Sequence, residues 1–523
     1  MAFKKCELSE RLRYSAWPVL LLAAVGCSVE DPSVLGESSE ALSSFRRPPF
    51  KGEVLARGVG GFAITGTSSA VLGGQLGYHA SAGDVNGDGL SDVLLLARRS
   101  AFVVFGKSDP ESLLIDDLAQ TEQGFAIVPS ATSTIPELFA IASAGDVNGD
   151  GLGDIVVGVP DTPEGGRGYV VFGKAEAEDV VLEDVAAGVG GFVITGSAPP
   201  AALGATVSGA DVNGDGFSDV LLGAWGDYAP GNLGKAFVVW GSATPTAVDI
   251  ADVQAGVGGF AVETERQENF ARVVSGAGDL NGDGLDDILV GAAAHDSQEI
   301  GEYAGRVYVV LGKTTTETVE ANAIAAGEGG FTIEAEQELD FLGVNGSGAG
   351  DVNGDGLDDA VFGLWGSNHR GTLLGGRAGY VVFGKQNTEA VYLAEVSAGS
   401  GGFAIQGYEH NLAGYSVAGR ADVNGDGFDD VMLGAVNAGP MGAGRAHVVF
   451  GKADTQPVRL VDVTWGDGGI TIVGEEPYAA LGYGVALAED LNGDGFGDAV
   501  AGSPGFGGCC YAGRAYVVLG KEF

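Results

Sequence analysis

Asp84-Val85-Asn86-Gly87-Asp88-Gly89-Leu90-Ser91-Asp92 is the first of seven copies of one nine-residue pattern, D-x-N-G-D-G-x-x-D. The copies start at intervals of 62, 65, 68, 72, 71 and 68 residues. One such stretch could arise by chance, whereas seven at a near-constant spacing indicate a repeat architecture. We call each copy an acidic loop and number its positions 1 to 9. The seven loops start at Asp84, Asp146, Asp211, Asp279, Asp351, Asp422 and Asp490.

Two further signals return in each cycle beside the acidic loop. One is a glycine turn that opens a short strand, as at 60–64, and the other is a strand that ends in a second turn, as at 305–313. Apolar runs also flank each loop, for example at 205–208 and 220–224. These runs give four short strands per cycle, rich in Val, Tyr and Phe and bounded by Gly. No stretch shows a sustained helical period. We therefore predict an all-β fold, a seven-bladed β-propeller of four-stranded blades.

The order of the signals predicts how the ring closes. The repeats begin with a Gly-Gly-Phe strand and finish on the strand at 513–521. In every other cycle the Gly-Gly-Phe strand is the fourth strand of the preceding blade. We therefore expect residues 61–66 to join the last blade, which leaves the ring without free central edges.

The residues around the loops resemble the FG-GAP repeat of integrin α-subunit propellers. Leu76-Gly77 and Leu203-Gly204 match the start of that repeat, and Gly158-Val159-Pro160 and Gly502-Ser503-Pro504 match its end. The resemblance extends over residues 58–523 and implies the same propeller fold. Integrin subunits carry the acidic loop in only some blades, whereas all seven cycles carry it here.

The chemistry of the acidic loop suits a hard cation. Side-chain oxygens at positions 1, 3, 5 and 9, with the carbonyl oxygen of position 7, can converge on one point, and the glycines allow the tight turn. Oxygen ligands of this kind suit Ca²⁺, and the loop has no thiol or imidazole to suit zinc. We predict up to seven structural Ca²⁺ ions, one per blade; the alternative is a plain Asx-rich hairpin turn. We also expect the apolar side chain at position 7 to point into its own blade. The predicted ligands are Asp84, Asn86, Asp88, Leu90, Asp92, Asp146, Asn148, Asp150, Leu152, Asp154, Asp211, Asn213, Asp215, Phe217, Asp219, Asp279, Asn281, Asp283, Leu285, Asp287, Asp351, Asn353, Asp355, Leu357, Asp359, Asp422, Asn424, Asp426, Phe428, Asp430, Asp490, Asn492, Asp494, Phe496 and Asp498.

The N-terminal segment has the features of an export signal. A basic start is followed by an apolar run at 16–25, which is shorter than the roughly 20 residues that a membrane-spanning helix needs. Ala24-Val25-Gly26-Cys27 resembles the lipobox of bacterial lipoproteins, which implies that Cys27 is lipidated. We expect a lipoprotein-type signal peptide at 1–26, a flexible tether at 27–55 and the propeller at 56–523. This places the chain at the outer membrane or cell surface; simple cleavage would leave it periplasmic or secreted.

Charge and cysteine content limit the partners and the compartment. The formal net charge is −43, and it would stay strongly negative with seven divalent ions bound. An acidic surface argues against nucleic acid and anionic lipid as partners, so membrane contact is expected only through the lipid anchor. Cys509 and Cys510 could form a vicinal disulfide in an oxidising compartment; the alternative is two unpaired thiols.

The face opposite the acidic loops is the expected ligand face. The connections between second and third strands lie there, and they vary most in length. Trp225, Tyr228, Trp365 and His369 could form a surface for protein or glycan, although each could instead anchor its own loop. In integrins this face receives the partner, and the resemblance transfers only that location.

We identify no catalytic residue in the sequence. The contiguous His295-Asp296-Ser297 is not expected to act as a triad, because triad members normally come from separate elements. The favoured interpretation is an exported calcium-binding propeller that acts in cell-surface adhesion, ligand binding or scaffolding, and not an enzyme. The alternative is a propeller enzyme acting on polysaccharide or phosphoester. Two acidic residues with a His or Arg in a central pocket would favour that alternative.

Overall fold

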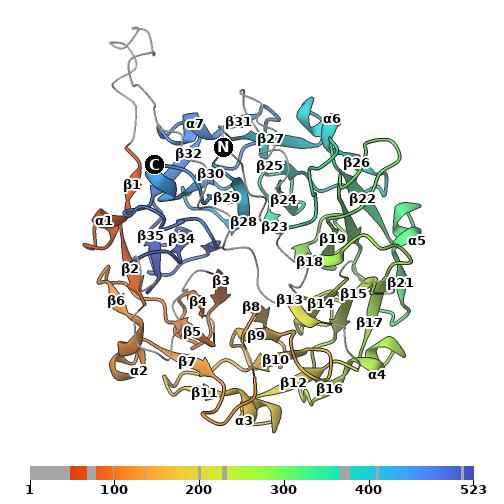
Figure 1. The fold of residues 1–523 in the computed structure, drawn as a ribbon, viewed down its shortest axis with the longest axis horizontal. Coiled ribbons are helices and arrows are strands. Elements are labelled where there is room, and N and C mark those ends of the chain that lie inside the picture. Colours follow the sequence, from red (N-terminus) through yellow and green to blue (C-terminus); the bar gives the residue numbers. More distant parts are fainter. Residues whose placement is uncertain are drawn as a thin grey trace, which may run out of the picture. The chain divides into compact units, whose positions relative to one another are not determined.

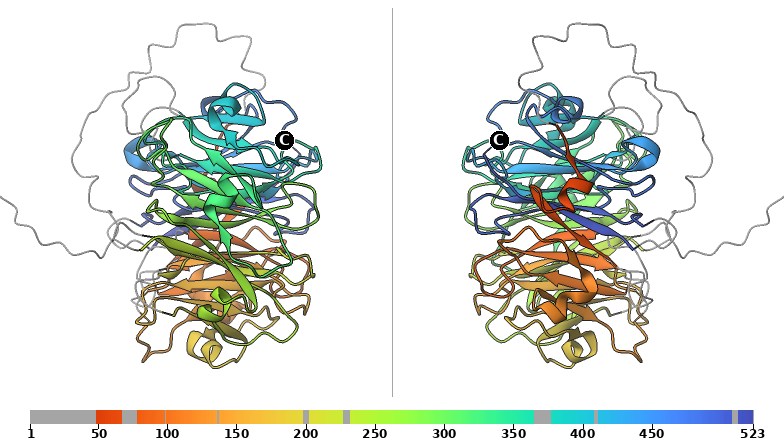
Figure 2. Two further views of the ribbon diagram at one scale, coloured as in Figure 1. Left: turned by 90° about the vertical axis from the view of Figure 1, so that its right-hand side faces the viewer. Right: turned by 90° about the vertical axis from the view of Figure 1, so that its left-hand side faces the viewer.

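The computed structural model describes residues 48–66, 78–97, 99–135, 137–197, 202–226, 232–364, 377–407, 411–507 and 512–522. These residues form seven five-stranded sheets arranged as the blades of a ring (Figure 1). Figure 2 shows the same blades edge-on. The predicted all-β, seven-bladed propeller is confirmed. No helix in the described ranges is long and apolar enough to cross a membrane.

Blade 2 shows the construction that every blade repeats. Strands β8 (Ala140–Gly145), β9 (Asp154–Val159), β10 (Arg167–Val171) and β12 (Gly191–Thr195) pair antiparallel in that order, from the centre outward. The two-residue strand β16 (Val248–Asp249) then pairs in parallel with β12. It comes from the next cycle, so each blade is bound at its rim by its successor.

The other blades use equivalent strands, which follow in order from the innermost outward. Blade 1 contains β3 (Tyr78–Gly83), β4 (Asp92–Ala97), β5 (Ser100–Val104), β7 (Gly124–Val128) and β11 (Val180–Val181). Blade 3 contains β13 (Leu203–Ala210), β14 (Asp219–Trp225), β15 (Gly234–Val239), β17 (Gly259–Glu263) and β21 (Val319–Glu320). Blade 4 contains β18 (Phe270–Gly278), β19 (Asp287–Ala292), β20 (Arg306–Val310), β22 (Gly330–Glu334) and β26 (Val391–Tyr392). Blade 5 contains β23 (Ser347–Gly350), β24 (Asp359–Gly363), β25 (Arg377–Val382), β27 (Gly402–Gln406) and β31 (Val458–Arg459). Blade 6 contains β28 (Ala413–Ala421), β29 (Asp430–Ala435), β30 (Arg445–Val449), β32 (Gly469–Val473) and β1 (Phe50–Lys51). Blade 7 contains β33 (Val485–Ala488), β34 (Asp498–Ser503), β35 (Arg514–Val518), β2 (Gly61–Thr65) and β6 (Leu113–Leu114).

The ring closes as the sequence predicts. Strand β2 pairs antiparallel with β35, with Gly61 opposite Val518 and Thr65 opposite Arg514. The N-terminal strand is therefore the fourth strand of the last blade. Strand β1 and helix α1 (Gly52–Leu55) lie before the predicted propeller start at residue 56, so the ordered ring begins inside the segment expected to be a tether.

Short helices at the outer rim were not predicted. They are α2 (Leu118–Thr121), α3 (Leu182–Ala186), α4 (Ile250–Gln254), α5 (Ala321–Ala325), α6 (Leu393–Ser397) and α7 (Leu460–Val463), with the 3₁₀ turn η2 (Ile115–Asp117) before α2. A second 3₁₀ turn, η3 (Pro440–Gly442), lies instead in the connection between β29 and β30. Each α-helix is about one turn long, too short to show a helical period in the sequence. In α3 that turn buries Leu182 and Val185, which are three residues apart and so lie on one face.

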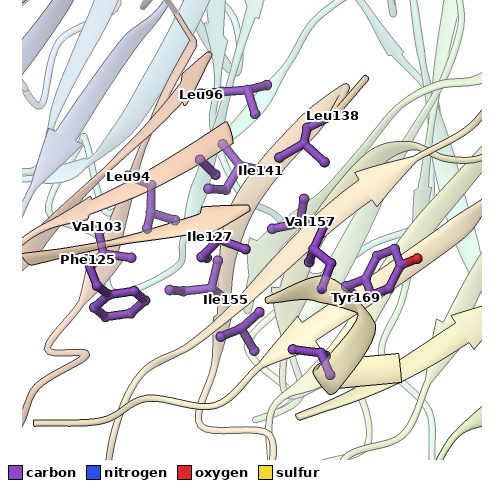
Figure 3. Packing of buried hydrophobic residues seen from close by; sticks show 14 of the residues in the cluster. Leu94, Leu96, Val103, Phe125, Ile127, Leu138, Ile141, Ile155, Val157 and Tyr169 are labelled. Carbon is purple, nitrogen blue, oxygen red and sulfur yellow. The ribbon is translucent and has the colours of Figure 1, made fainter. Parts of the chain in front are cut away.

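The hydrophobic core lies between neighbouring blades. Figure 3 shows Leu94 and Ile127 of blade 1 packed with Ile155 and Val157 of blade 2. All four side chains are fully buried. Because both faces of each sheet are covered by a neighbour, strands such as β9 are buried along their whole length.

Candidate metal centre

Every acidic loop connects the innermost strand of its blade to the second strand. Position 9 is the first residue of the second strand, as Asp92 is of β4 and Asp154 is of β9. The blades repeat around the ring, so all seven loops lie at the same end of it. The described ranges include every loop in full.

The position-1 carboxylate organises the turn of its loop. In loop 1, Oδ1 of Asp84 accepts the backbone N–H groups of Gly87 and Asp88 at 2.7 and 3.1 Å, and Oδ2 accepts that of Gly89 at 2.8 Å. The same three bonds form in the other six loops. Gly87 and Gly89 have φ angles of +78° and +86°, which a side chain rarely adopts.

Positions 3 and 5 bind each other and the rest of the loop. In loop 1 the Asn86 amide donates to Oδ2 of Asp88 at 2.9 Å, and Oδ1 of Asp88 accepts the N–H of Leu90 at 2.9 Å. The bond from position 7 to position 5 recurs in every loop. The side chains of positions 3 and 5 therefore turn back onto their own loop and do not point away into solvent.

The position-9 carboxylate is buried and ties the loop to its blade. Asp92 has no exposed surface; Oδ2 accepts the N–H of Val85 and Oδ1 that of Gly106, both at 2.8 Å. Gly106 lies in the turn between the third and fourth strands. Burial, together with the neighbouring charges of Asp88 and Asp84, raises the pKa of Asp92 to about 7, although the two backbone hydrogen bonds oppose the shift. Burial raises the pKa of the equivalent carboxyl in the other six loops too.

The predicted convergence of ligands on a single ion is not seen. Among the described residues, no group of three or more His, Cys, Asp or Glu side chains has an arrangement that could hold a metal ion. The carboxylates instead accept backbone N–H groups. The donor set nevertheless fits a hard divalent cation. All its donor atoms are oxygens, and each carboxylate has lone pairs beyond those it uses here. The carboxylates of Asp84 and Asp88 are also close enough to Asp92 to raise its pKa.

Three segments match the FG-GAP repeat. They are residues 139–171, 270–310 and 481–518, which lie in blades 2, 4 and 7. Each matched segment includes the innermost strand of its blade, the acidic loop and the next two strands.

Curated relatives include integrin α chains. Integrin alpha pat-2 of Caenorhabditis elegans is 28% identical over 255 residues, which cover 44% of this chain and 18% of that protein. Phosphatidylinositol-glycan-specific phospholipase D of Bos taurus is 29% identical over 169 residues, covering 32% of this chain and 19% of the enzyme. The chain thus spans less than a fifth of the length of either relative. A crystal structure of BBS1N in complex with ARL6DN, soaked with lead, covers 87% of this chain and 95% of its own, at 9% identity and a TM-score of 0.41. This likeness supports no argument about function.

An acidic pocket lies at the loop end of the ring, where residues of blades 4, 5, 6 and 7 line it. Its volume is about 460 Å³, and its lining includes Asp286, Asp358, Asp429, Glu489 and Arg420. The three aspartates occupy position 8 of loops 4, 5 and 6. Burial raises the pKa of Asp286, while Arg420 opposes that shift. The pocket thus combines acidic residues with an arginine, the kind of cluster that would favour an enzyme. Its three aspartates were not predicted, because position 8 is Asp in only three of the seven loops.

Of the predicted ligand-face residues, the structure describes only Trp225. It is the last residue of β14 and is half-buried. The Arg272 guanidinium lies 4.1 Å from its ring centroid, and Phe139 meets it edge-on at 5.7 Å. Trp225 therefore brings blades 2, 3 and 4 together at the end opposite the acidic loops. Tyr228, Trp365 and His369 lie outside the described residues.

The consecutive His295, Asp296 and Ser297 do not form a catalytic triad. His295 is buried and its Nδ1 lies 2.6 Å from Oε2 of Glu268. Asp296 accepts the N–H of Tyr303, and Ser297 accepts that of Ile300. Each side chain is committed to a different local contact.

Several other predictions concern residues outside the described ranges. Residues 1–47 contain the predicted signal peptide, Cys27 and most of the tether, and residues 508–511 contain Cys509 and Cys510.

Proposed function

We propose that the chain is an exported, calcium-binding FG-GAP propeller that binds a protein or glycan partner at the cell surface. The similarity to integrin α chains supports a ligand-binding or adhesion module. The observation that carries the calcium part is the sevenfold recurrence of one oxygen-only donor set at one end of the ring. A plain turn needs no such repetition of the same positions.

Calcium would act as a structural ion. The residues that would hold it are positions 1, 3, 5 and 9 and the carbonyl of position 7, and the ion would supply positive charge among crowded carboxylates. The loops join the two innermost strands of each blade, so neutralising them would stabilise the centre of the ring. Because an ion that binds only the folded state stabilises it by mass action, unfolding should depend on free calcium.

Metal analysis and thermal unfolding test this role. Purified protein should contain up to seven calcium ions per chain, and chelation should lower the melting temperature by many degrees, with recovery on adding Ca²⁺. The matched variant is Asp88→Asn, which removes one charged donor while keeping the shape of the side chain. It should bind one ion fewer. Far fewer than one ion per blade in an intact propeller would overturn the proposal.

Export and lipidation rest on the N-terminal pattern alone. Cell fractionation of the full chain and a Cys27→Ser variant tests them, because loss of the acylated residue should move the protein from the membrane fraction to the soluble exported fraction. An unprocessed N-terminus in the cytoplasm would contradict export.

A glycan and extracellular-matrix binding screen, run with and without chelator, tests the partner class. If the face around Trp225 is the ligand face, Trp225→Ala should weaken binding. Trp465→Ala is the matched control, because Trp465 is 48% exposed and follows the rim helix α7. Equal effects of the two variants would argue against the proposed face.

A propeller enzyme is a second candidate function, favoured by the acidic pocket with Arg420 and by the similarity to a phospholipase D. The pocket carries more acidic than basic groups, which suits a neutral polysaccharide better than a phosphoester anion. Turnover of a polysaccharide or phosphodiester panel, abolished by Asp429→Asn with the fold intact, would support it. A panel without turnover would leave the binding module as the better account.

A further inference from the structure

We propose that the seven acidic loops bind Ca²⁺ as coupled neighbours around the closed ring, and that the coupling is strongest between loops 3, 4, 5 and 6. This inference rests on the proposed calcium function. It comes from the contacts that each loop makes with the loop before it.

The first contact is a backbone hydrogen bond between consecutive loops. The N–H of position 8 donates to the carbonyl oxygen of position 1 in the preceding loop. Gly153 of loop 2, for example, donates to Asp84 of loop 1 at 2.8 Å. The bond recurs at every joint, including the closure, where Ser91 of loop 1 donates to Asp490 of loop 7 at 2.8 Å. The residue at position 1, the main organiser of each loop, is thus held by the next blade.

The second contact fixes position 2 of each loop. The residue after the Gly of the third-to-fourth strand turn donates its N–H to the position-2 carbonyl of the preceding loop. Lys174 of blade 2 donates to Val85 of loop 1 at 2.8 Å, and Lys521 of blade 7 donates to Val423 of loop 6 at 3.0 Å. Since the N–H of Val85 also donates to the buried Asp92, position 2 connects the position-9 carboxylate with the neighbouring blade.

The third contact comes from the side chain of position 7, which was expected to point into its own blade. It lies instead against the position-4 glycine of the preceding loop. A Cβ atom built on Gly149 of loop 2 would be 2.4 Å from the Phe217 ring of loop 3. The carbonyl of position 7 is a predicted ligand, so one residue would touch its own ion and support the loop of another.

Three of the seven joints have an additional bond in the reverse direction. The N–H of Asp358 in loop 5 donates to the Asp279 carbonyl of loop 4 at 3.1 Å, and the N–H of Asp279 donates back to Oδ2 of Asp358 at 2.8 Å. Asp286 and Asp429 form the same reciprocal pair with the loops before them. The residue at position 8 is Ser91, Gly153, Ser218 or Gly497 in the remaining loops.

These contacts make the order of one loop depend on its neighbours. An ion that fixes positions 1 and 7 also fixes groups that the adjacent loops use, so the next ion to bind has less conformational freedom to remove. Coupling of this kind is reciprocal. Reciprocal pairs fix the backbone of both loops at a joint and should transmit more of the effect than single bonds.

Hydrogen–deuterium exchange during calcium titration of the full chain reads each loop separately. The first variant is Asp283→Asn, which weakens the site of loop 4. The calcium concentration that half-protects loops 3 and 5 should rise by roughly fivefold or more. Loops 1 and 7 do not contact loop 4 and serve as internal controls, so their half-protecting concentration should stay the same.

The second variant is Asp358→Ser, which places at position 8 the residue that loops 1 and 3 carry naturally. Combined with Asp283→Asn, it should reduce the shift in loop 5 and leave the shift in loop 3 unchanged. Exchange of the β-strands in chelator shows whether each variant is folded. If all seven loops gain protection and the variants shift only loop 4, the coupling is refuted and the calcium function stands. If no loop of the wild-type chain responds to calcium, the proposed function itself fails.

Discussion

Gly149→Ala is the substitution whose effect the structure predicts most sharply. Gly149 occupies position 4 of loop 2 with a φ of +75°, and an added Cβ would meet the ring of Phe217 at 2.4 Å. Gly493, at the same position of loop 7, has a φ of +82°, and its added Cβ would meet only the Leu90 tip at 3.3 Å. The two glycines share their backbone conformation and differ in the neighbour.

The expected loss of folding free energy has two contributions, the strained backbone of a left-handed alanine and the packing of its Cβ atom. A left-handed alanine costs roughly 1–2 kcal/mol at either site. Overpacking adds typically about 1–3 kcal/mol at Gly149, because the partly buried Phe217 side chain moves only as a rigid ring. At Gly493 the nearest atom is the end of a flexible leucine, so this cost does not apply. We expect Gly149→Ala to destabilise the propeller by about 2–5 kcal/mol and Gly493→Ala by about 1–2 kcal/mol.

Denaturant unfolding in excess chelator measures both variants without a contribution from ion binding. The double variant Gly149→Ala with Phe217→Leu introduces at this joint the leucine found at four of the seven joints. It should recover most of the difference in stability between the two single variants. Equal destabilisation by the two single variants, or no rescue by the leucine, would refute the assignment of position 7 as the link between blades.

Two further predictions concern the blades themselves. His447 is fully buried in β30 with Nδ1 2.8 Å from Oγ1 of Thr471, and burial lowers its pKa to about 3 from the usual 6.5. A depressed pKa means that stability is lost as pH falls below 6.5, by about 2 kcal/mol at pH 5. His447→Tyr places opposite Thr471 the residue that faces Thr332 in blade 4, and it should make stability in urea titrations less dependent on pH between 7 and 5. An unchanged pH dependence would show that His447 is not responsible. Deletion of residues 56–66 removes β2, so blade 7 should lose exchange protection before the other blades, and thermal unfolding identical to that of the full chain would show that β2 does not close the ring.

The sequence was sufficient for the main features of the fold because they are local. Four Gly-bounded strands per cycle specify a blade, and the phase of the Gly-Gly-Phe strand specifies the closure by β2. The acidic loop could also be located from the sequence, since its glycines and its position-1 aspartate build a turn within nine residues. The rim strands were missed, because two-residue strands such as β16 leave too short a pattern.

What the sequence by itself determined is the repeat: seven blades, seven acidic loops at one end, and the strand that closes the ring. These follow from spacing and local turn chemistry, which act within one cycle. Only the tertiary structure decided how the cycles meet. The position-7 side chain lies on the glycine of the preceding loop, and Asp358 pairs with Asp279, 79 residues away. Such contacts depend on how closely two blades pack, and the spacing of residues along the chain does not determine that distance.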